Sequence, residues 1–364
     1  MDSLAIVAAI AGLVFLVAGA EALVRGASRL AAIAGISPLV IGLTIVAYGT
    51  SAPELFVSLQ ANWLGQADIS IGNVVGSNIF NVLFILGLSS LVVPLVVAQQ
   101  LIRLDVPIMI GVSLLTLLLG MDRHLSPAEG MFLFMGGVGY TLFLIWHSRK
   151  EHNEAVQAEY DGAYPPQVSS PRQWLINFAW IGIGLVGLAL GSRWLLAGAT
   201  SIAKALGLSE LIIGLTIIAI GTSLPELCTS VVASIRGERD IAVGNVVGSN
   251  IFNILVVLGV ASIASPQGVH ISGAALRFDI PMMIAVAIAC LPIFFTGNRI
   301  ERWEGLLFMG YYVAYTTYLI MEAMNHEQLP LFSTILGTFV IPLTVLTLVI
   351  VTVREVRAHS HPHQ

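Results

Sequence analysis

The chain has 364 residues, of which 57% are hydrophobic and only 10% are charged, and its formal net charge is −5. Charged residues make up about a quarter of a typical soluble domain, so this composition excludes an ordinary soluble protein and predicts one that lies in a lipid bilayer. A net negative charge without a basic, aromatic-interleaved patch excludes nucleic acid as a partner.

Long apolar stretches follow one another along the whole chain. Each has about 20 residues, enough for a helix to cross a hydrocarbon core of roughly 30 Å. In chain order we expect transmembrane helices near residues 4–24, 38–62, 71–97, 103–120, 127–147, 174–195, 209–234, 242–264, 276–296, 303–323 and 331–353. The first of these helices follows Asp2 and is not preceded by a basic segment, so we interpret it as a retained helix rather than a secretory signal. The predicted fold class is therefore all-α, a polytopic membrane protein.

Lys and Arg are unevenly distributed among the segments that connect these helices. If the N-terminus lies outside, about twelve of them fall in inside segments and four in outside segments. Basic residues are enriched in cytoplasmic loops, so the count favours an outside N-terminus and, for eleven spans, an inside C-terminus.

A polar cassette occurs twice within this apolar sequence. GTSAPE at residues 49–54 is followed by GNVVGSNIFN at 72–81, and GTSLPE at 221–226 is followed by GNVVGSNIFN at 244–253. The two copies are offset by 172 positions, and 29 of the 46 residues from 42 to 87 are identical in the second copy. Each copy places a glutamate inside a predicted span, where a charge is costly and by default functional.

The similarity extends over five predicted spans in each half of the chain. We expect one half at residues 1–147 and the other at 173–323, joined by a charged linker at 148–172. Residues 324–364 add an eleventh span and a polar tail that contains His. Because five is an odd number, the second half must enter the membrane from the opposite side. Inverted repeats with interrupted polar helices are typical of secondary transporters, whose substrate site lies between the halves.

The cassette residues supply oxygen atoms on shared helix faces. Thr50 and Glu54 are four positions apart with Ser51 beside them, and Ser77 and Asn81 repeat this spacing on the next helix. Their counterparts in the second half are Thr222, Ser223, Glu226, Ser249 and Asn253. Hard cations such as Ca²⁺ and Na⁺ take oxygen ligands, and the absence of His and Cys from this set argues against zinc and copper.

Each cassette also carries residues that interrupt a regular helix. Pro53 and Pro225 cannot donate to the carbonyls four residues back, so we expect the oxygens of Gly49 and Gly221, or of near neighbours, to be freed as cation ligands. Four further asparagines are interpreted as interhelical hydrogen-bonding residues rather than ligands. They are Asn73, Asn78, Asn245 and Asn250.

The doubled GTSxPE and GNVxGSNIxN pattern resembles that of the cation/calcium exchanger superfamily, specifically its prokaryotic sodium/calcium exchangers. The resemblance implies a secondary transporter rather than an enzyme: an antiporter of a prokaryotic cytoplasmic (inner) membrane that moves Na⁺ inward and Ca²⁺ outward by alternating access. It implies no cofactor and no obligate protein partner. The ion-binding positions it implies, two backbone carbonyls included, are Ala47, Thr50, Ser51, Glu54, Ser77, Asn81, Ala219, Thr222, Ser223, Glu226, Ser249 and Asn253.

One feature departs from the family pattern. Members often have Asp at one of the two positions that are Asn81 and Asn253 here. The charge on the ion sites then rests on two glutamates, enough to neutralise one Ca²⁺ or two Na⁺. K⁺ co-transport is in doubt for the same reason, because the K⁺-dependent relatives resemble the Asp-bearing form.

Three alternatives remain open at this stage. An H⁺/Ca²⁺ antiporter on the same fold would load a desolvated glutamate with a proton, although proton exchangers resemble a pattern with an additional Glu in the GN segment. A passive cation channel would use the same carboxylates and carbonyls without counter-ion coupling. A serine hydrolase would need a general base near Ser51 or Ser223, and all eight His lie far from either cassette in the sequence.

Overall fold

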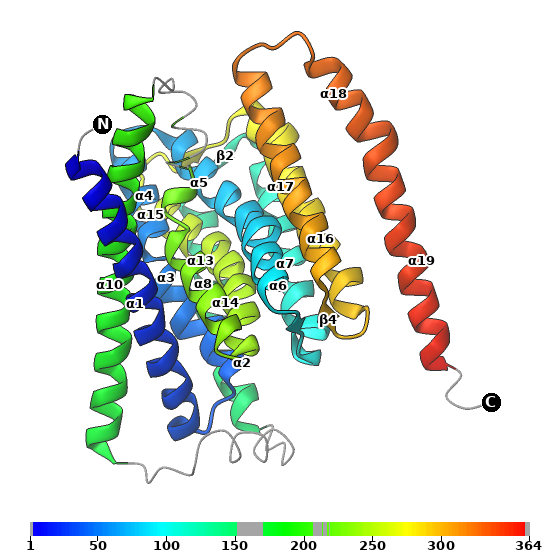
Figure 1. Ribbon diagram of the computed structural model, residues 1–364. Helices are drawn as coiled ribbons and strands as arrows, with labels where there is room; N and C mark the ends of the chain where they lie inside the picture. Colours follow the sequence, from blue (N-terminus) through cyan, green and yellow to red (C-terminus); the bar gives the residue numbers. More distant parts are fainter. Residues whose placement is uncertain (1–2, 151–169, 207–212, 214–216, 218, 361–364) are drawn as a thin grey trace.

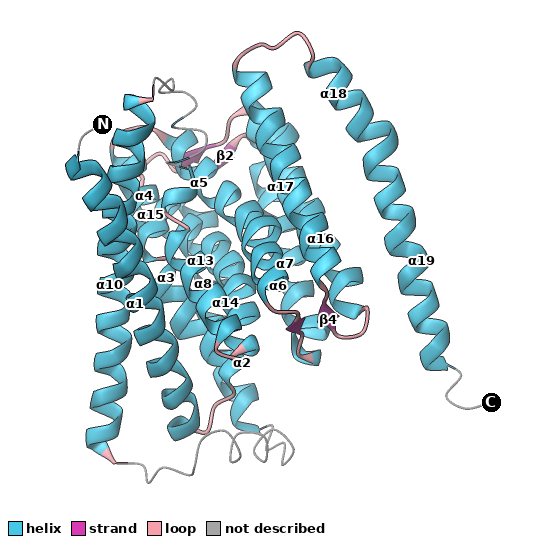
Figure 2. Cartoon of the chain, viewed as in Figure 1, coloured by secondary structure: helices cyan, strands magenta, loops and turns pink. Residues whose placement is uncertain are grey.

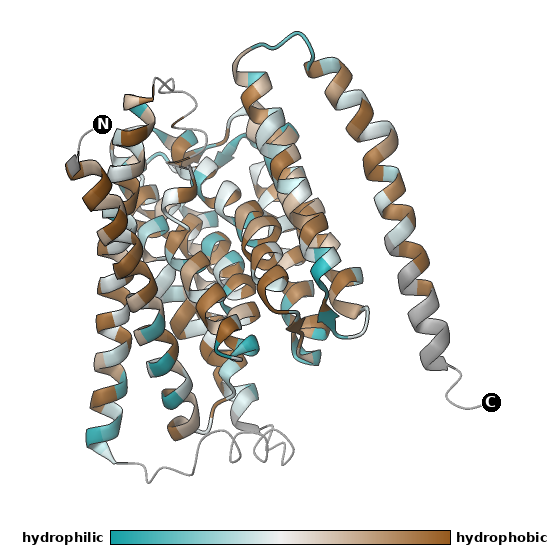
Figure 3. Cartoon of the chain, in the orientation of Figure 1, coloured by the Kyte–Doolittle hydropathy of each residue, from teal (hydrophilic) through white to brown (hydrophobic). Residues whose placement is uncertain are grey.

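The structure, a computed structural model, describes residues 3–150, 170–206, 213, 217 and 219–360. Long helices run side by side, with the first helix at one flank of the bundle and the last at the other (Figure 1). Figure 2 shows that almost all of the described chain is helical. Apolar residues predominate along the outer helices, as expected where helices face lipid (Figure 3). The prediction of an all-α polytopic membrane protein is confirmed, apart from four very short strands.

The helices of residues 1–150 come in the order in which the sequence predicts them. They are α1 (Ser3–Ala34), α2 (Pro38–Ile41), η1 (Gly42–Val46), α3 (Ala47–Thr50), α4 (Ala52–Trp63), α5 (Ala67–Phe80), η2 (Asn81–Leu86), α6 (Gly87–Val92), η3 (Leu101–Asp105), α7 (Val106–Leu119), η4 (Gly120–Asp122) and α8 (Pro127–Lys150). The η segments are π-helical except for η4, which is a 3₁₀ turn.

The remaining helices begin after the linker. They are α10 (Pro171–Ala205), α12 (Ala219–Gly221), α13 (Leu224–Ile235), α14 (Arg239–Phe252), η6 (Asn253–Leu258), α15 (Gly259–Ala264), η7 (Ala275–Asp279), α16 (Ile280–Phe295), α17 (Arg302–Ala323), α18 (Leu329–Ile335), η8 (Leu336–Val340) and α19 (Ile341–Ser360). Most of the linker and the last residues of the His-containing tail lie outside the described residues.

Two helices are much longer than their apolar stretches. The predicted ends at residues 24 and 195 are wrong, because α1 continues to Ala34 and α10 to Ala205. The two helices pack against each other along their length, and glycines bring their backbones into contact. A Cβ atom on Gly12 would lie 2.3 Å from the backbone nitrogen of Leu195. Such close packing stabilises helix beyond the lipid-facing stretch from which the spans are predicted.

Eight helices of the described chain are long and apolar enough to span a membrane. A ninth is the pair Pro38–Thr50 and Ala52–Trp63, which is bent by 43°. Two of the eleven expected spans remain. One is α17, whose tyrosines and charged residues lower its mean hydropathy, and the other includes α13, which follows a stretch that is only partly described.

Four two-residue strands, which the sequence did not predict, form two ladders. Strand β1 (Leu95–Val96) pairs antiparallel with β4 (Arg299–Ile300), and β2 (His124–Leu125) pairs antiparallel with β3 (Val269–His270). Each ladder joins a loop of residues 1–147 to a loop of residues 173–323. They are too short for an alternating pattern of apolar residues to be visible in the sequence.

The cassette-bearing helices lie at the centre of the bundle. In the apolar window of the continuous helix Arg239–Ala264, 83% of residues are buried, and in Ala67–Val92 the share is 78%, against 28% in α1. Glycines of α14 allow this packing, since a Cβ on Gly248 would lie 2.6 Å from the carbonyl oxygen of Leu43. The outer helices thereby separate the polar cassettes from lipid.

Candidate ion-binding site

Both cassettes coincide with a break in a helix. Helix α3 ends at Thr50 and α4 begins at Ala52, while in the second cassette α12 ends at Gly221 and α13 begins at Leu224. A proline is the second residue of the helix that follows each break, where a missing N–H group is tolerated. Glu54 and Glu226 each lie in the first turn of that helix. The partial positive charge of a helix N-terminus stabilises a carboxylate at this position.

The two glutamates are completely buried and are held by serines of the opposite cassette. Ser51 Oγ donates a hydrogen bond of 2.7 Å to Glu226 Oε1, and Ser223 Oγ donates one of 3.0 Å to Glu54 Oε1. The Oγ atoms of Ser223 and Ser77 are 3.0 Å apart. These crossed contacts bring the two cassettes, far apart in sequence, into one cluster.

Four asparagine side chains connect the helices that carry the GN segments. Asn81 Nδ2 donates to Asn250 Oδ1 and Asn253 Nδ2 donates to Asn78 Oδ1, each at 3.0 Å. Asn78 and Asn250 in turn donate their Nδ2 groups to each other's backbone carbonyls, at 3.1 and 3.3 Å. Because the amide nitrogens of Asn81 and Asn253 are engaged, their Oδ1 atoms are left as acceptors.

Several buried oxygens of this cluster accept no hydrogen bond from any group in the part of the chain that the structure describes. They are Glu54 Oε2, Asn81 Oδ1, Glu226 Oε2, Ser249 Oγ and Asn253 Oδ1. An unsatisfied buried polar group costs about 1–3 kcal/mol, and an ionised one costs more. Two of these five oxygens belong to carboxylates, so the set favours a ligand that supplies positive charge. Hard cations have this property.

The threonines of the cassettes are less available as ligands. Thr50 Oγ1 contacts the carbonyl of Val46 and donates to Asn245 Oδ1 at 3.0 Å, while Thr222 Oγ1 contacts Asn73 Oδ1 at 3.3 Å. Asn73 Nδ2 donates to the backbone oxygen of Glu54 at 3.0 Å.

The remaining asparagine of the second cassette and the carbonyl of Ala47 both take part in hydrogen bonds. Asn245 Nδ2 donates to the backbone oxygen of Glu226 at 3.3 Å. The interpretation of Asn73, Asn78, Asn245 and Asn250 as interhelical hydrogen-bonding residues is thus confirmed. The carbonyl of Ala47 accepts from the N–H of Ser51 at 3.0 Å, and Ala219 begins α12.

A residue that the sequence analysis did not identify satisfies one of the carbonyls beside a proline. Ser192 Oγ on α10 donates a hydrogen bond of 2.6 Å to the carbonyl oxygen of Gly221. Pro225 has no N–H group to donate to this oxygen, and the Ser192 hydroxyl takes the place of the missing donor. The corresponding residue of the first half is Ala20, which has no hydroxyl. This difference between equivalent positions of the two halves is the feature of the sequence that could have pointed to Ser192.

Nowhere in the described chain do acidic, His and Cys residues gather in groups of three or more that could hold a metal ion. The candidate site instead combines two carboxylates with neutral hydroxyl and amide oxygens. Such a mixed set provides less charge than an all-carboxylate cage and suits cations that must leave as well as enter.

Comparison with known proteins agrees with this chemistry. Residues 4–146 and 176–321 match the family model described as "Sodium/calcium exchanger protein". The chain is 42% identical to the "Putative antiporter CaxA" of Alkalimonas amylolytica over 86% of this chain and 97% of that protein. It is 36% identical to the "Inner membrane protein YrbG" of Escherichia coli, over 85% and 95% of the two chains. The solved structure of the sodium/calcium exchanger from Methanococcus jannaschii superposes with a TM-score of 0.73 at 28% identity, covering 87% and 99% of the two chains.

Proposed function

The chain belongs to the sodium/calcium exchanger protein family, and we propose that it works as a secondary antiporter in which Na⁺ and Ca²⁺ compete for one site between its two cassettes. The observation that carries this proposal is the pair of fully buried glutamates, Glu54 and Glu226, each bonded to a serine of the other cassette. It is a transporter and not an enzyme.

The charge of the site explains why exchange is coupled. Two ionised carboxylates without a counter-charge are strongly destabilised in a low-dielectric interior. The protein therefore does not change between its outward-open and inward-open states while the site is empty, whereas it does so when the site holds Ca²⁺ or Na⁺. Since both ions need the same oxygens, one must leave before the other can bind, and net movement of either ion is coupled to the opposite movement of its competitor.

The proposed ligand set is the one that the sequence motifs single out. Its members are Ala47, Thr50, Ser51, Glu54, Ser77, Asn81, Ala219, Thr222, Ser223, Glu226, Ser249 and Asn253. The unpaired oxygens of Glu54, Glu226, Asn81, Asn253 and Ser249 support the central role of these five residues. The threonines and the Ala47 carbonyl already take part in hydrogen bonds, so their roles are secondary.

We also propose that residues 1–147 and 173–323 are two inverted repeats, with residues 148–172 as the linker and 324–364 as an addition. The paired short strands support this division, because β1 and β3 occupy equivalent positions in the two halves, as do β2 and β4, and each pairs across the halves. The crossed hydrogen bonds between serines and glutamates have the same reciprocity. Two such halves around one site can open alternately to either side.

In a prokaryotic cytoplasmic membrane, with the N-terminus outside, the protein uses the inward Na⁺ gradient to extrude Ca²⁺. The distribution of Lys and Arg supports this orientation, and the relative named as an inner membrane protein supports this location. Neither a cofactor nor an obligate protein partner is part of the proposal.

The deciding experiment is Ca²⁺ uptake into proteoliposomes. We expect an outward Na⁺ gradient to drive accumulation and a pH or K⁺ gradient of equal size to drive little. Accumulation driven by the pH gradient alone would establish the H⁺/Ca²⁺ antiporter instead, and uptake without any counter-ion would establish a passive channel.

A further inference from the structure

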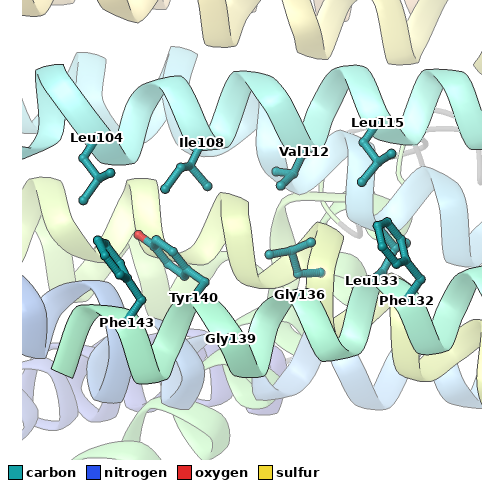
Figure 4. A pocket seen from close by; sticks show the side chains of 11 residues that line it. Leu104, Ile108, Val112, Leu115, Phe132, Leu133, Gly136, Gly139, Tyr140 and Phe143 are labelled. Carbon is teal, nitrogen blue, oxygen red and sulfur yellow. The ribbon is translucent and has the colours of Figure 1, made fainter. Parts of the chain in front are cut away.

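An elongated cavity lies between α7 and α8, outside the candidate ion site (Figure 4). Its volume is about 460 Å³. One wall is a stripe of aliphatic side chains that runs from Leu104 to Leu115, at successive turns of one helix. Opposite this stripe, the labelled residues of α8 run from Phe132 to Phe143, and Figure 4 shows side chains of the two helices directed toward one another.

Two residues without side chains create the space on the α8 wall. Gly136 and Gly139 lie between the two phenylalanines that mark the ends of the stretch, and both glycines are exposed. A Cβ atom added to Gly139 meets no atom of the described residues within 4 Å, and one on Gly136 only reaches ordinary contact with Leu255 at 3.6 Å. The cavity is therefore open enough to accept atoms from another molecule.

The chemistry of the walls excludes an ion or a polar solute. The single polar side chain of the lining is Tyr140, and its hydroxyl donates a hydrogen bond of 2.8 Å to Asp105 Oδ1. All the other lining residues are aliphatic, phenylalanine or glycine. An occupant that gains free energy here must be apolar, because a polar group would lose its hydration without finding a partner.

The equivalent face of the second half is covered by other parts of the described chain. The Asp105–Tyr140 bond has its counterpart in the bond from Tyr315 to Asp279, at 3.1 Å, which aligns α8 with α17. In this alignment Gly136 corresponds to Tyr311, whose hydroxyl donates to Thr344 Oγ1 of α19 at 2.6 Å. A bulky side chain and the additional helix thus cover that face. No segment of the described chain covers the groove of the first half in the same way.

Dimensions identify which apolar molecule fits. The stripe covers twelve residues, Leu104 to Leu115, and spans about 16 Å along the helix axis. This is roughly half of a 30 Å hydrocarbon core and so the depth of one leaflet. Spread over that length, about 460 Å³ corresponds to a cross-section of roughly 30 Å², whereas a helix of about 10 Å diameter needs roughly 80 Å². We propose that the groove between α7 and α8 binds one acyl chain of a membrane phospholipid.

The test fills the groove without changing the ion site. A double variant, Gly136→Leu with Gly139→Leu, places side chains where the acyl chain would lie. The matched control is Gly111→Leu on α7, an exposed glycine outside the groove whose added Cβ meets no described atom within 4 Å. We expect native mass spectrometry of the purified protein to show one retained phospholipid in the wild type and the control. Retention in the double variant should fall roughly tenfold, which corresponds to about 1.4 kcal/mol.

Equal lipid retention in the double variant and the control would overturn the proposal. A second measurement identifies the occupant: with Phe132→p-benzoylphenylalanine, light should yield an adduct with the mass of a phospholipid in native membranes. A product of twice the chain mass would instead assign the groove to a second copy of the protein and overturn the lipid proposal. Ca²⁺ exchange by the double variant shows that it is folded, and loss of exchange in ion-site variants leaves the lipid result unaffected.

Discussion

Ser51 and Glu226 are 175 positions apart in the sequence, and Ser51 Oγ donates a hydrogen bond of 2.7 Å to Glu226 Oε1. The same relationship holds in reverse between Ser223 and Glu54 at 3.0 Å. Each carboxylate is thus oriented by the cassette of the other half, and the second oxygen of each has no hydrogen-bond partner among the described residues. A change in the relative position of the two halves alters both glutamates at once, which is what alternating access requires of a shared site.

Removal of one carboxylate charge should abolish exchange. Glu226→Gln keeps the shape of the side chain but leaves a single charge to balance Ca²⁺, and leaving a buried charge unpaired costs about 3–5 kcal/mol. We expect Ca²⁺ binding, measured by isothermal titration calorimetry, to weaken by more than about 100-fold. Glu54→Gln should behave in the same way.

The control for this prediction is Glu327→Gln, at an exposed position between α17 and α18. It should bind and transport Ca²⁺ normally. If both ion-site variants retained wild-type exchange in proteoliposomes, the assignment of the site to the cassettes would be wrong.

Loss of a single hydroxyl should weaken the site without destroying it. Ser51→Ala removes both a proposed ligand and the donor to Glu226, and a hydrogen bond to a charged group contributes about 1.5–3 kcal/mol. We therefore expect Ca²⁺ affinity to fall by roughly 10- to 100-fold, with a similar effect for Ser223→Ala.

Ser201→Ala is the matched control, because Ser201 is exposed on α10 and, among the described residues, its hydroxyl bonds to the carbonyl of Ala197 on its own helix. An effect of Ser201→Ala as large as that of Ser51→Ala would show that the measurement reports general damage to the fold.

A third carboxylate should make the empty protein less stable. In Asn253→Asp the donor to Asn78 Oδ1 becomes a charged acceptor, so two oxygens face each other where a hydrogen bond of 3.0 Å now lies. We expect a lower melting temperature without ions and a larger rise in melting temperature on addition of Ca²⁺ than in the wild type. Asn81→Asp should show the same pattern through its contact with Asn250. Unchanged melting with and without Ca²⁺ would contradict the proposed roles of the two asparagines.

The hydroxyl that satisfies Gly221 should matter for stability rather than for ion binding. Ser192→Ala removes the hydroxyl that donates to the buried carbonyl of Gly221, and Pro225 has no N–H group to replace it. An unsatisfied buried carbonyl costs about 1–3 kcal/mol. We expect a lower melting temperature at saturating Ca²⁺, with Ca²⁺ affinity changed by less than about threefold. Ala20→Ser, at the equivalent position of the first half, should not lower stability. A melting temperature equal to that of the wild type would show that another group satisfies the carbonyl.

The cassettes predicted which polar residues lie buried together better than the apolar stretches predicted where helices end. The cassettes name every residue whose buried oxygen is unpaired in the cluster, because a polar side chain has few reasons to lie inside an apolar span. Helix ends at residues 24 and 195 were misplaced, since α1 and α10 are extended by glycine-mediated contacts with each other and not by hydropathy. The short strands were missed because two residues carry no periodic signal.

The sequence by itself determined that this protein lies in a membrane, that its polar residues form two related cassettes and that their chemistry is oxygen-only. Every charge inside a bilayer is costly, so a glutamate that occurs within an apolar span indicates a function. Only the tertiary structure decided which oxygen faces which partner. Ser51 bonds to Glu226 rather than to Glu54, Asn78 bonds to Asn250, and Ser192 takes the carbonyl of Gly221. These pairings depend on how separate helices pack in space, and a helical period in one segment contains no information about its neighbour.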